Sequence, residues 1–211
     1  MDAEVLTSTT ASYDSIVADY ERQTSSPPDA ELSFRDSFVD ALSSSAFVAD
    51  LGCGPGRDLQ AFRSAGLWAV GLDASTQMTR RVAEQGLPVV VGDLRQAPLA
   101  SARWHGVWSS ASLLHVPHEE VLATLQDWAR LLASGGLLGL TTSLGHDDSG
   151  WEAVPYAPGA QVRQEPLRRW FAHHDRDFIE RSLAEAGFRV VEASVRESHR
   201  TWLQLLARRQ H

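Results

Sequence analysis

Short apolar runs alternate with amphipathic segments along most of the chain. The apolar runs predict β-strands, and the segments with apolar residues at helical spacing predict α-helices. Strands are expected at 46–51, 68–72, 88–91, 106–109, 137–142, 188–194 and 201–207. Helices are expected at 57–65, 75–85, 118–133 and 175–186, and each is followed closely by a glycine.

The order of these elements predicts an α/β architecture. Strands that alternate with helices form parallel βαβ units, so we expect a mainly parallel, doubly wound sheet of seven strands with helices on both faces. The last two strands have no helix between them, which predicts a C-terminal antiparallel hairpin. Residues 151–174 fit neither pattern and are expected to form a long irregular connection, a kind of segment that is often functional.

Residues 1–45 precede the first strand and form a separate helical segment. Ser25-Ser26-Pro27-Pro28 interrupts two short helical patterns within it. Their apolar positions are Tyr13, Ile16, Val17 and Tyr20 in the first, and Leu32, Phe38, Val39 and Leu42 in the second. We therefore expect two helices that pack onto a domain formed by residues 46–211.

Composition narrows the class of protein. The 211 residues carry a net charge of −8 and 43% hydrophobic residues, which is typical of a globular chain of about one domain. The acidic balance disfavours nucleic acid and anionic membranes as partners. A single cysteine excludes an internal disulfide framework. With no signal-peptide pattern and no apolar run of about 20 residues, a cytoplasmic protein is expected.

A glycine-rich turn follows the first predicted strand. Asp50-Leu51-Gly52-Cys53-Gly54-Pro55-Gly56 joins that strand to a helix. Its three glycines remove side chains from the turn, so a ligand can approach the backbone closely. The dinucleotide pattern G-x-G-x-x-G would need a third glycine where Arg57 stands. The spacing therefore disfavours a pyrophosphate-binding turn.

This turn resembles the first motif of class I S-adenosylmethionine-dependent methyltransferases. The resemblance covers roughly 46–207 and includes the small-molecule, trans-aconitate or ubiquinone type of these enzymes. It implies a Rossmann-like fold, S-adenosyl-L-methionine as cofactor, and in-line transfer of a methyl group to an oxygen, nitrogen or carbon nucleophile of a small acceptor. It also implies that residues 1–45 form an N-terminal helical lid.

The resemblance implies a set of cofactor contacts. Asp50 attracts the methionine ammonium group, Asp73 accepts from the ribose hydroxyls, and Asp93 accepts from the adenine amine. Cys53 is expected to pack rather than react. The implied cofactor-binding residues are Asp50, Gly52, Cys53, Gly54, Gly56, Asp73, Ala74, Met78, Asp93, Leu94, Ser109, Tyr13 and Tyr20.

Further candidates lie after the fourth strand and in 151–174. His115 is similar to a histidine of many small-molecule members, where it acts as a general base or orients the loop. Residues 109–112 lack the D/N-P-P-Y/F motif of enzymes that methylate nucleobase amines, which argues against a nucleic-acid substrate. The catalytic candidates are His115, His173 and His174, and the substrate-binding candidates are Trp151, Tyr156, Arg168, Arg169 and Trp170.

Several alternatives remain open at this level. A nicotinamide-dependent oxidoreductase is disfavoured by Arg57, and a non-catalytic S-adenosylmethionine-binding module is disfavoured mildly by His115 and the aromatic residues of 151–174. His146-Asp147-Asp148 has metal-ligating residue types, but without a second cluster of oxygen ligands it predicts a hydrated turn, so no metal site is expected. A monomer and a homodimer fit the sequence equally well.

Overall fold

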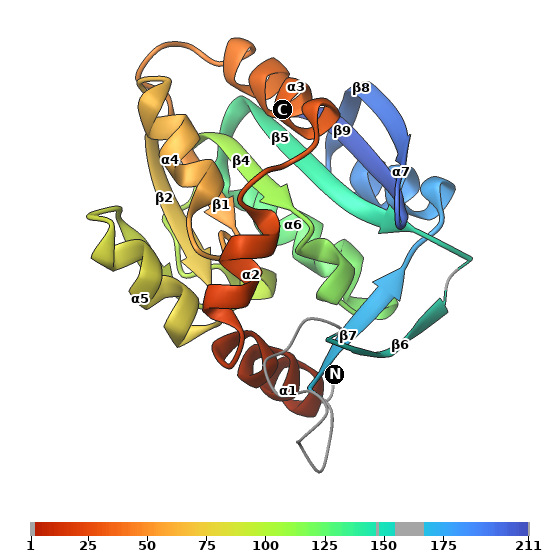
Figure 1. The fold of residues 1–211 in the computed structure, drawn as a ribbon. Coiled ribbons are helices and arrows are strands. Elements are labelled where there is room, and N and C mark those ends of the chain that lie inside the picture. Colours follow the sequence, from red (N-terminus) through yellow and green to blue (C-terminus); the bar gives the residue numbers. More distant parts are fainter. Residues whose placement is uncertain (1–2, 147, 155–166, 211) are drawn as a thin grey trace.

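The computed structural model describes residues 3–146, 148–154 and 167–210. Its main sheet has seven strands in the order β3-β2-β1-β4-β5-β9-β8 (Figure 1). These strands are β1 (Phe47–Leu51), β2 (Trp68–Asp73), β3 (Val89–Val91), β4 (Trp104–Ser110), β5 (Leu132–Leu144), β8 (Phe188–Glu197) and β9 (Thr201–Arg209).

The pairing within this sheet matches the sequence pattern. Strands β1 to β5 pair in parallel, as βαβ units require. Strand β9 is antiparallel to both neighbours, β5 and β8. The predicted C-terminal hairpin is therefore confirmed, and with it the Rossmann-like α/β fold.

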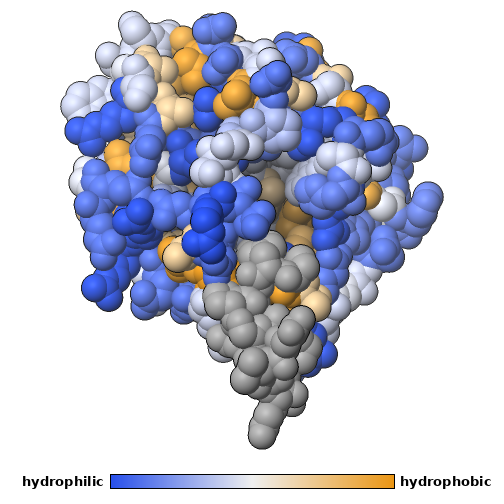
Figure 2. All heavy atoms as spheres, in the orientation of Figure 1, coloured by the Kyte–Doolittle hydropathy of each residue, from blue (hydrophilic) through white to orange (hydrophobic). Residues whose placement is uncertain are grey.

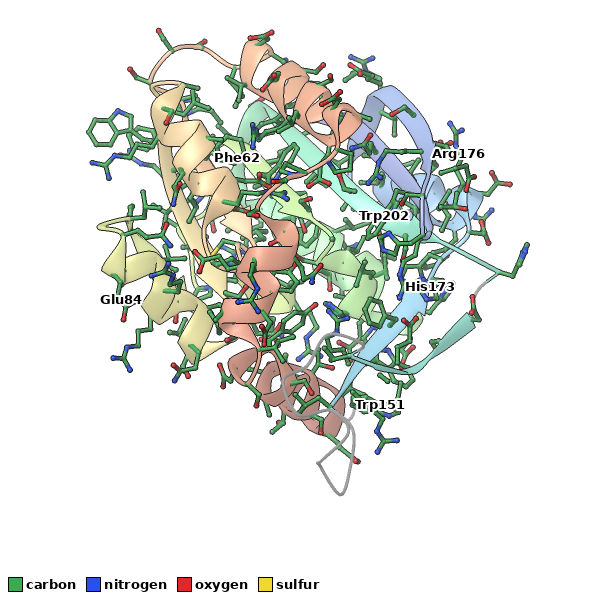
Figure 3. The ribbon with its side chains drawn as sticks, viewed as in Figure 1. Phe62, Glu84, Trp151, His173, Arg176 and Trp202 are labelled. Carbon is green, nitrogen blue, oxygen red and sulfur yellow. The ribbon has the colours of Figure 1, made fainter. Side chains whose placement is uncertain are left out.

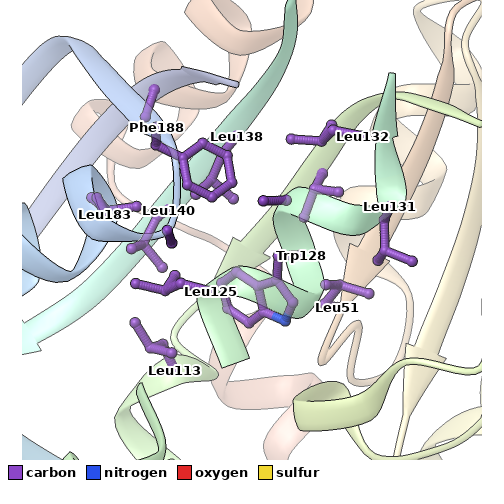
Figure 4. Close-up of a cluster of buried hydrophobic side chains, with 14 of the residues drawn as sticks. Leu51, Leu113, Leu125, Trp128, Leu131, Leu132, Leu138, Leu140, Leu183 and Phe188 are labelled. Carbon is purple, nitrogen blue, oxygen red and sulfur yellow. The ribbon is translucent and has the colours of Figure 1, made fainter. Parts of the chain in front are cut away.

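Helices cover both faces of the sheet. They are α1 (Ala3–Asp14), α2 (Val17–Thr24), α3 (Asp29–Asp40), α4 (Arg57–Ser64), α5 (Thr76–Glu84), α6 (Val121–Leu131) and α7 (Arg176–Glu185), with 3-10 turns at Leu94–Gln96, Leu113–His115 and His118–Glu120. On one face, α6 and α7 pack Leu125, Trp128 and Leu183 against the sheet (Figure 4). On the other, Phe38 of α3 and Phe62 of α4 pack around Trp108.

Several elements differ from the sequence prediction in number or bounds. Residues 1–45 contain three helices rather than two, because the first pattern bends between α1 and α2. Helix α6 ends at Leu131, four residues before Gly135, and β5 begins directly at Leu132. Here pairing of Leu132 with Trp104 of β4 outweighs the helical pattern.

The expectation of an irregular connection over 151–174 was wrong where the structure describes it. Strands β6 (Asp148–Ala153) and β7 (Arg168–His173) form a second, two-stranded antiparallel sheet. Their side chains do not alternate cleanly between apolar and polar, so periodicity gave no strand signal. Helix α1 packs against β7, where the Ser12 hydroxyl donates to the Arg168 carbonyl at 2.6 Å and the Trp170 amide donates to Thr9 Oγ1 at 3.0 Å.

None of the helices in the described part of the chain combines the length and apolar character needed to cross a membrane.

Candidate functional site

The glycine-rich turn lies at the carboxyl end of β1. Gly52, Gly54 and Gly56 all have positive φ, at 79°, 52° and 91°. A Cβ on Gly52 would lie 2.1 Å from Ser112 Oγ, so this position excludes any larger residue. The turn is thus held against the loop that follows β4, and its backbone faces the space between them.

Asp73 ends β2 beside this turn. Its Oδ2 accepts from the Gly54 amide at 2.9 Å, and its Oδ1 accepts from the Ser75 amide at 2.8 Å. Burial raises the pKa of the Asp73 carboxyl, and the two amides oppose that rise. These bonds fix the carboxylate in one orientation while leaving each oxygen a second lone pair for a hydroxyl donor.

A cavity of about 630 Å³ lies between the turn, the end of β2 and helix α1. Many of the cofactor-binding residues implied by the sequence line it together: Tyr13, Tyr20, Gly52, Gly54, Asp73, Ala74, Met78, Asp93 and Leu94. His115 lines it as well. Sequence reasoning missed the remaining wall, because nothing local marks it: Leu6, Thr9, Thr10, Leu72, Ser75, Gly92, Ala111 and Ser112.

Asp93 reaches this cavity but is already strongly engaged. Arg95 donates to both of its oxygens, with Nε 2.9 Å from each, and the Arg95 amide donates to Oδ1 at 2.9 Å. Arg95 also donates to Glu120 at 2.8 Å. The carboxylate is therefore held in place by an arginine, and it keeps only its remaining lone pairs for a ligand.

A larger cavity of about 1680 Å³ adjoins the first. The two share Tyr13, Tyr20, Gly52, Gly54 and Ala111 as walls. Figure 2 shows a hollow in this face of the molecule, with apolar side chains inside and polar ones around it. The larger, outer cavity therefore adjoins the smaller, inner one along these shared residues.

Asp50 and Cys53 line the larger cavity. Asp50 is 2% exposed, and no described residue donates a hydrogen bond to its carboxylate. Burial raises its pKa well above the ordinary range, the charges of Asp58 and Asp73 raise it further, and Arg57 opposes them. A buried carboxylate in this state fits a cationic ligand group such as an ammonium. Burial also raises the pKa of the Cys53 thiol, which keeps it protonated and unreactive.

His115 connects three segments of the chain. Its Nδ1 lies 2.5 Å from the Trp170 carbonyl oxygen, and because a carbonyl only accepts, Nδ1 carries the proton. Its Nε2 then accepts from the Tyr13 hydroxyl at 2.8 Å, and that hydroxyl accepts from Arg169 at 3.2 Å. Both ring nitrogens are thus engaged, and the ring ties α1 and β7 to the loop after β4.

The pKa of His115 is lowered to about 4, mainly by burial and also by the nearby charges of Arg169 and Arg200. The unfolded chain therefore takes up a proton near pH 6.5 that the folded chain does not take up until about pH 4. We expect stability to fall by at most about 3 kcal/mol from His115 as the pH drops through this window.

Replacing His115 with glutamine should remove this part of the pH dependence. The free energy of unfolding, measured by urea titration at pH 7, 5.5 and 4.5, should fall less steeply in His115→Gln than in the wild type. The exposed His199→Gln serves as the control and should keep the wild-type slope. Equal slopes in all three proteins would contradict the assignment.

The structure places the remaining sequence candidates in different ways. Arg169 is buried and lines the larger cavity. Tyr156 lies outside the described residues. The others line neither cavity: Gly56, Ser109, Trp151, Arg168, Trp170, His173 and His174. Of these, Gly56 starts α4 with a left-handed backbone, and Trp170 contributes its carbonyl to His115.

His173 and His174 sit behind the cavity walls. The two ring nitrogens of His173 form hydrogen bonds with the Ser143 hydroxyl, at 2.8 Å, and with the Glu152 carboxylate, at 3.0 Å. The residue lies on the same side of the molecule as Trp202 (Figure 3). His174 is fully buried and packs beside His118 and Phe178. Their placement gives no support to a catalytic role, because neither residue lines either of the two cavities.

The structure adds residues that the sequence did not single out. Strand β8, the turn after it and β9 bring a set of polar and aromatic side chains to the larger cavity: Arg196, Ser198, His199, Arg200 and Trp202. In the sequence this segment looks like an ordinary charged hairpin turn. Only the antiparallel return of β9 beside β5 brings it over the carboxyl end of the sheet.

Metal binding finds no support in the described ranges, where His, Cys, Asp and Glu side chains form no group of three or more that could hold an ion.

Comparison with known proteins bears on these observations. Residues 48–136 match the family described as a methyltransferase domain. The chain is 33% identical over 121 residues to a malonyl-[acyl-carrier protein] O-methyltransferase from Enterobacter lignolyticus, a match that covers 54% of this chain and 47% of that protein. The protein of the same name from Pseudescherichia vulneris is 32% identical over 115 residues. The chain spans about half the length of the curated relatives it matches.

Solved structures show the same fold over the whole chain. The 1,6-didemethyltoxoflavin-N1-methyltransferase of Burkholderia thailandensis, crystallised with 1,6-didemethyltoxoflavin and S-adenosylhomocysteine, has a TM-score of 0.77 at 17% identity and covers 100% of this chain and 91% of its own. DhpI in complex with S-adenosylhomocysteine has a TM-score of 0.76 at 18% identity and covers 100% and 99%. Residues 48–136 thus match a methyltransferase domain, and the chain as a whole has the fold of a solved methyltransferase.

Proposed function

We propose that this protein transfers a methyl group from S-adenosyl-L-methionine to a small-molecule acceptor. The observation that carries the proposal is the meeting of Asp50, Asp73 and the glycine-rich turn at two adjoining cavities. A buried, unneutralised Asp50 suits the cofactor's ammonium group, and the fixed Asp73 carboxylate suits the hydroxyls of a ribose. The residues present therefore fit this cofactor.

The protein's own contribution is alignment and the exclusion of water. When bound, S-adenosyl-L-methionine supplies a methyl group on a sulfonium, which is a good leaving group. Tyr13 and Tyr20 line both cavities, so helices α1 and α2 border the place where donor and acceptor meet. Orientation of two reactants in a dry site accounts for about 7–11 kcal/mol of a barrier in favourable cases.

We infer that α1 and α2 act as a lid that is fixed at the C-terminal end of α1. Asp14, the last residue of α1, accepts from the Ser75 hydroxyl at 2.5 Å and from the Gln77 amide at 3.0 Å, and so joins the lid to the start of α5. The preceding residue, Tyr13, donates to His115 and joins the same end of α1 to the loop after β4. Because both nitrogens of His115 are engaged, it serves this proposal as an orienting residue rather than a general base.

The proposal also covers partners and location. A small-molecule acceptor is favoured over nucleic acid by the net charge of −8 and by the missing nucleobase-amine motif. A cytoplasmic location, no membrane partner and a monomeric or homodimeric state belong to the same proposal.

Thermal unfolding tests the cofactor assignment directly. S-adenosylmethionine and S-adenosylhomocysteine, each at a hundredfold Kd, should stabilise the protein by about 2.7 kcal/mol, which is roughly 5–10 °C for a chain of this length. NAD should have no effect. Asp73→Asn should lose most of the shift, whereas the exposed Glu180→Gln should retain it. Stabilisation by NAD alone would overturn the proposal.

A further inference from the structure

Arg196 lines the larger cavity, and its positive charge has no carboxylate within hydrogen-bond distance among the described residues. Its side chain is 16% exposed, and its nearest carboxylate oxygen, on Glu31, is 3.9 Å from Nη2, beyond hydrogen-bond distance. That carboxylate already accepts from Arg57 at 2.5 Å. Within the described ranges none of the Arg196 nitrogens donates a hydrogen bond, and Nε is fully shielded. Shielding Nε from water without a hydrogen bond is unfavourable, and the two terminal nitrogens are not shielded in this way.

The neighbouring arginines are more fully engaged. Arg200 pairs with Glu152 through both guanidinium nitrogens, and hydrogen bonds from Arg200 lower the pKa of Glu152 to about 2. Arg57 pairs with Glu31 and Asp58. Arg169, which also lines the cavity, donates to the Tyr13 hydroxyl, whereas Arg196 has only the distant, shared carboxylate of Glu31 within the described residues.

The surroundings of Arg196 are aromatic. Its guanidinium lies 5.9 Å from the Trp202 ring centroid, and Arg200 lies 4.5 Å from that of Phe171 on the same wall. Leu114 and Ala153 complete an apolar part of the lining. A pocket with apolar walls and one oriented polar group is the usual form of a site for a small organic molecule.

We propose that the methyl acceptor is a small organic acid whose carboxylate is bound by Arg196, with its apolar part against Trp202 and Phe171. This inference rests on the proposed function, because it places the acceptor next to the cofactor pocket. A guanidinium fork matches the two oxygens of a carboxylate, which explains an arginine at this position. In the transfer, the methyl–sulfur bond would break with its electron pair staying on sulfur, the acceptor's nucleophilic atom would use its own lone pair for the new bond to carbon, and any proton on that atom would pass to water.

Matched ligand pairs test the proposal. The wild-type protein, saturated with S-adenosylhomocysteine, is titrated calorimetrically with acetate, hexanoate, benzoate and phenylacetate and with the primary amide of each. At least one acid should bind tenfold or more tightly than its amide. Arg196→Met should reduce this preference at least tenfold. Arg189→Met, which removes an exposed arginine at the other end of β8, should keep it.

The outcomes separate this inference from the proposed function. Failure of S-adenosylhomocysteine to bind the wild type would refute the proposed function itself. If it binds, but no acid is preferred over its amide, or if Arg196→Met keeps the preference, the acid-binding role of Arg196 is wrong. Unchanged S-adenosylhomocysteine affinity shows that Arg196→Met is folded. If Arg196→Met is not folded, Arg196→Lys takes its place. An undiminished preference of Arg196→Lys for an acid over its amide overturns the proposal.

Discussion

Replacing Asp58 with asparagine is expected to destabilise the protein by about 3–5 kcal/mol, the usual cost of removing one partner from a buried ion pair. Asp58 is 6% exposed and is the centre of a buried network. Arg57 donates to both of its oxygens at 3.1 Å, Arg35 donates to Oδ1 at 3.3 Å, and the Trp108 indole donates to Oδ2 at 3.0 Å. Without this charge, two arginines remain desolvated with too little negative charge beside them.

The pH dependence of this effect has a defined sign. Burial alone would raise the pKa of Asp58, but Arg57, Trp108 and Arg35 together lower it. A lowered pKa means that the stabilisation is complete above the ordinary value near 4 and is lost as the pH falls through the folded value. The wild type and Asp58→Asn should therefore become similar in stability in strong acid.

Thermal unfolding at pH 7 measures the effect as a fall in midpoint of roughly 6–20 °C. Glu180→Gln removes the carboxylate of an exposed pair with Arg176 on α7 and is the matched control. Exposed pairs of this kind contribute about 0–1 kcal/mol, so its midpoint should hardly change. A midpoint for Asp58→Asn within the range of this control would show that the network does not stabilise the fold.

Replacing Asp50 with asparagine is expected to have the opposite effect on the ligand-free protein. Burial raises the pKa of Asp50, so the ionised carboxylate opposes folding at neutral pH. Each unit of raised pKa is worth about 1.4 kcal/mol, and its removal should raise the unfolding midpoint by about 3–6 °C per unit. The advantage of the variant should shrink as the pH falls towards 4 and disappear below it, where the wild-type carboxyl is protonated in both states.

The same substitution should weaken the binding of the cofactor. If Asp50 binds the ammonium group of S-adenosylhomocysteine, its loss removes a charged hydrogen bond worth about 1.5–3 kcal/mol, which is a tenfold to hundredfold rise in Kd. Calorimetric titration and thermal unfolding of the same sample would reveal both effects. A variant that is less stable alone, yet binds S-adenosylhomocysteine as tightly as the wild type, would make Asp50 a structural residue only.

Opposite changes in stability are expected for Asp58→Asn and Asp50→Asn, and this difference separates a structural carboxylate from a candidate binding residue. Both carboxylates are buried and belong to the same turn and helix start. Asp58 is paired with arginines and an indole of the protein, whereas Asp50 lines the larger cavity, where we propose that it binds the cofactor. A stability cost that the ligand-free protein retains is typical of functional positions.

The sequence by itself determined the architecture and many of the residues that line the smaller cavity. Alternation of strands and helices predicted the parallel sheet and the terminal hairpin, since both follow from local periodicity and connection length. The turn glycines and Asp50 and Asp73 were predictable because each lies at the end of a strand or directly after it. Parallel strands bring their carboxyl ends to one edge of a sheet, so these short local motifs meet without further information.

Only the tertiary structure decided which residues line the larger cavity and how their charged groups are paired. Arg196 and Trp202 lie more than a hundred residues beyond Asp50 in the chain, and only the antiparallel return of β9 carries them to the same cavity. The partners of His115 come from α1 and β7, which no local pattern connects. Sequence periodicity reports which face of an element is buried, whereas pairing, desolvation and pKa depend on which distant groups that face meets.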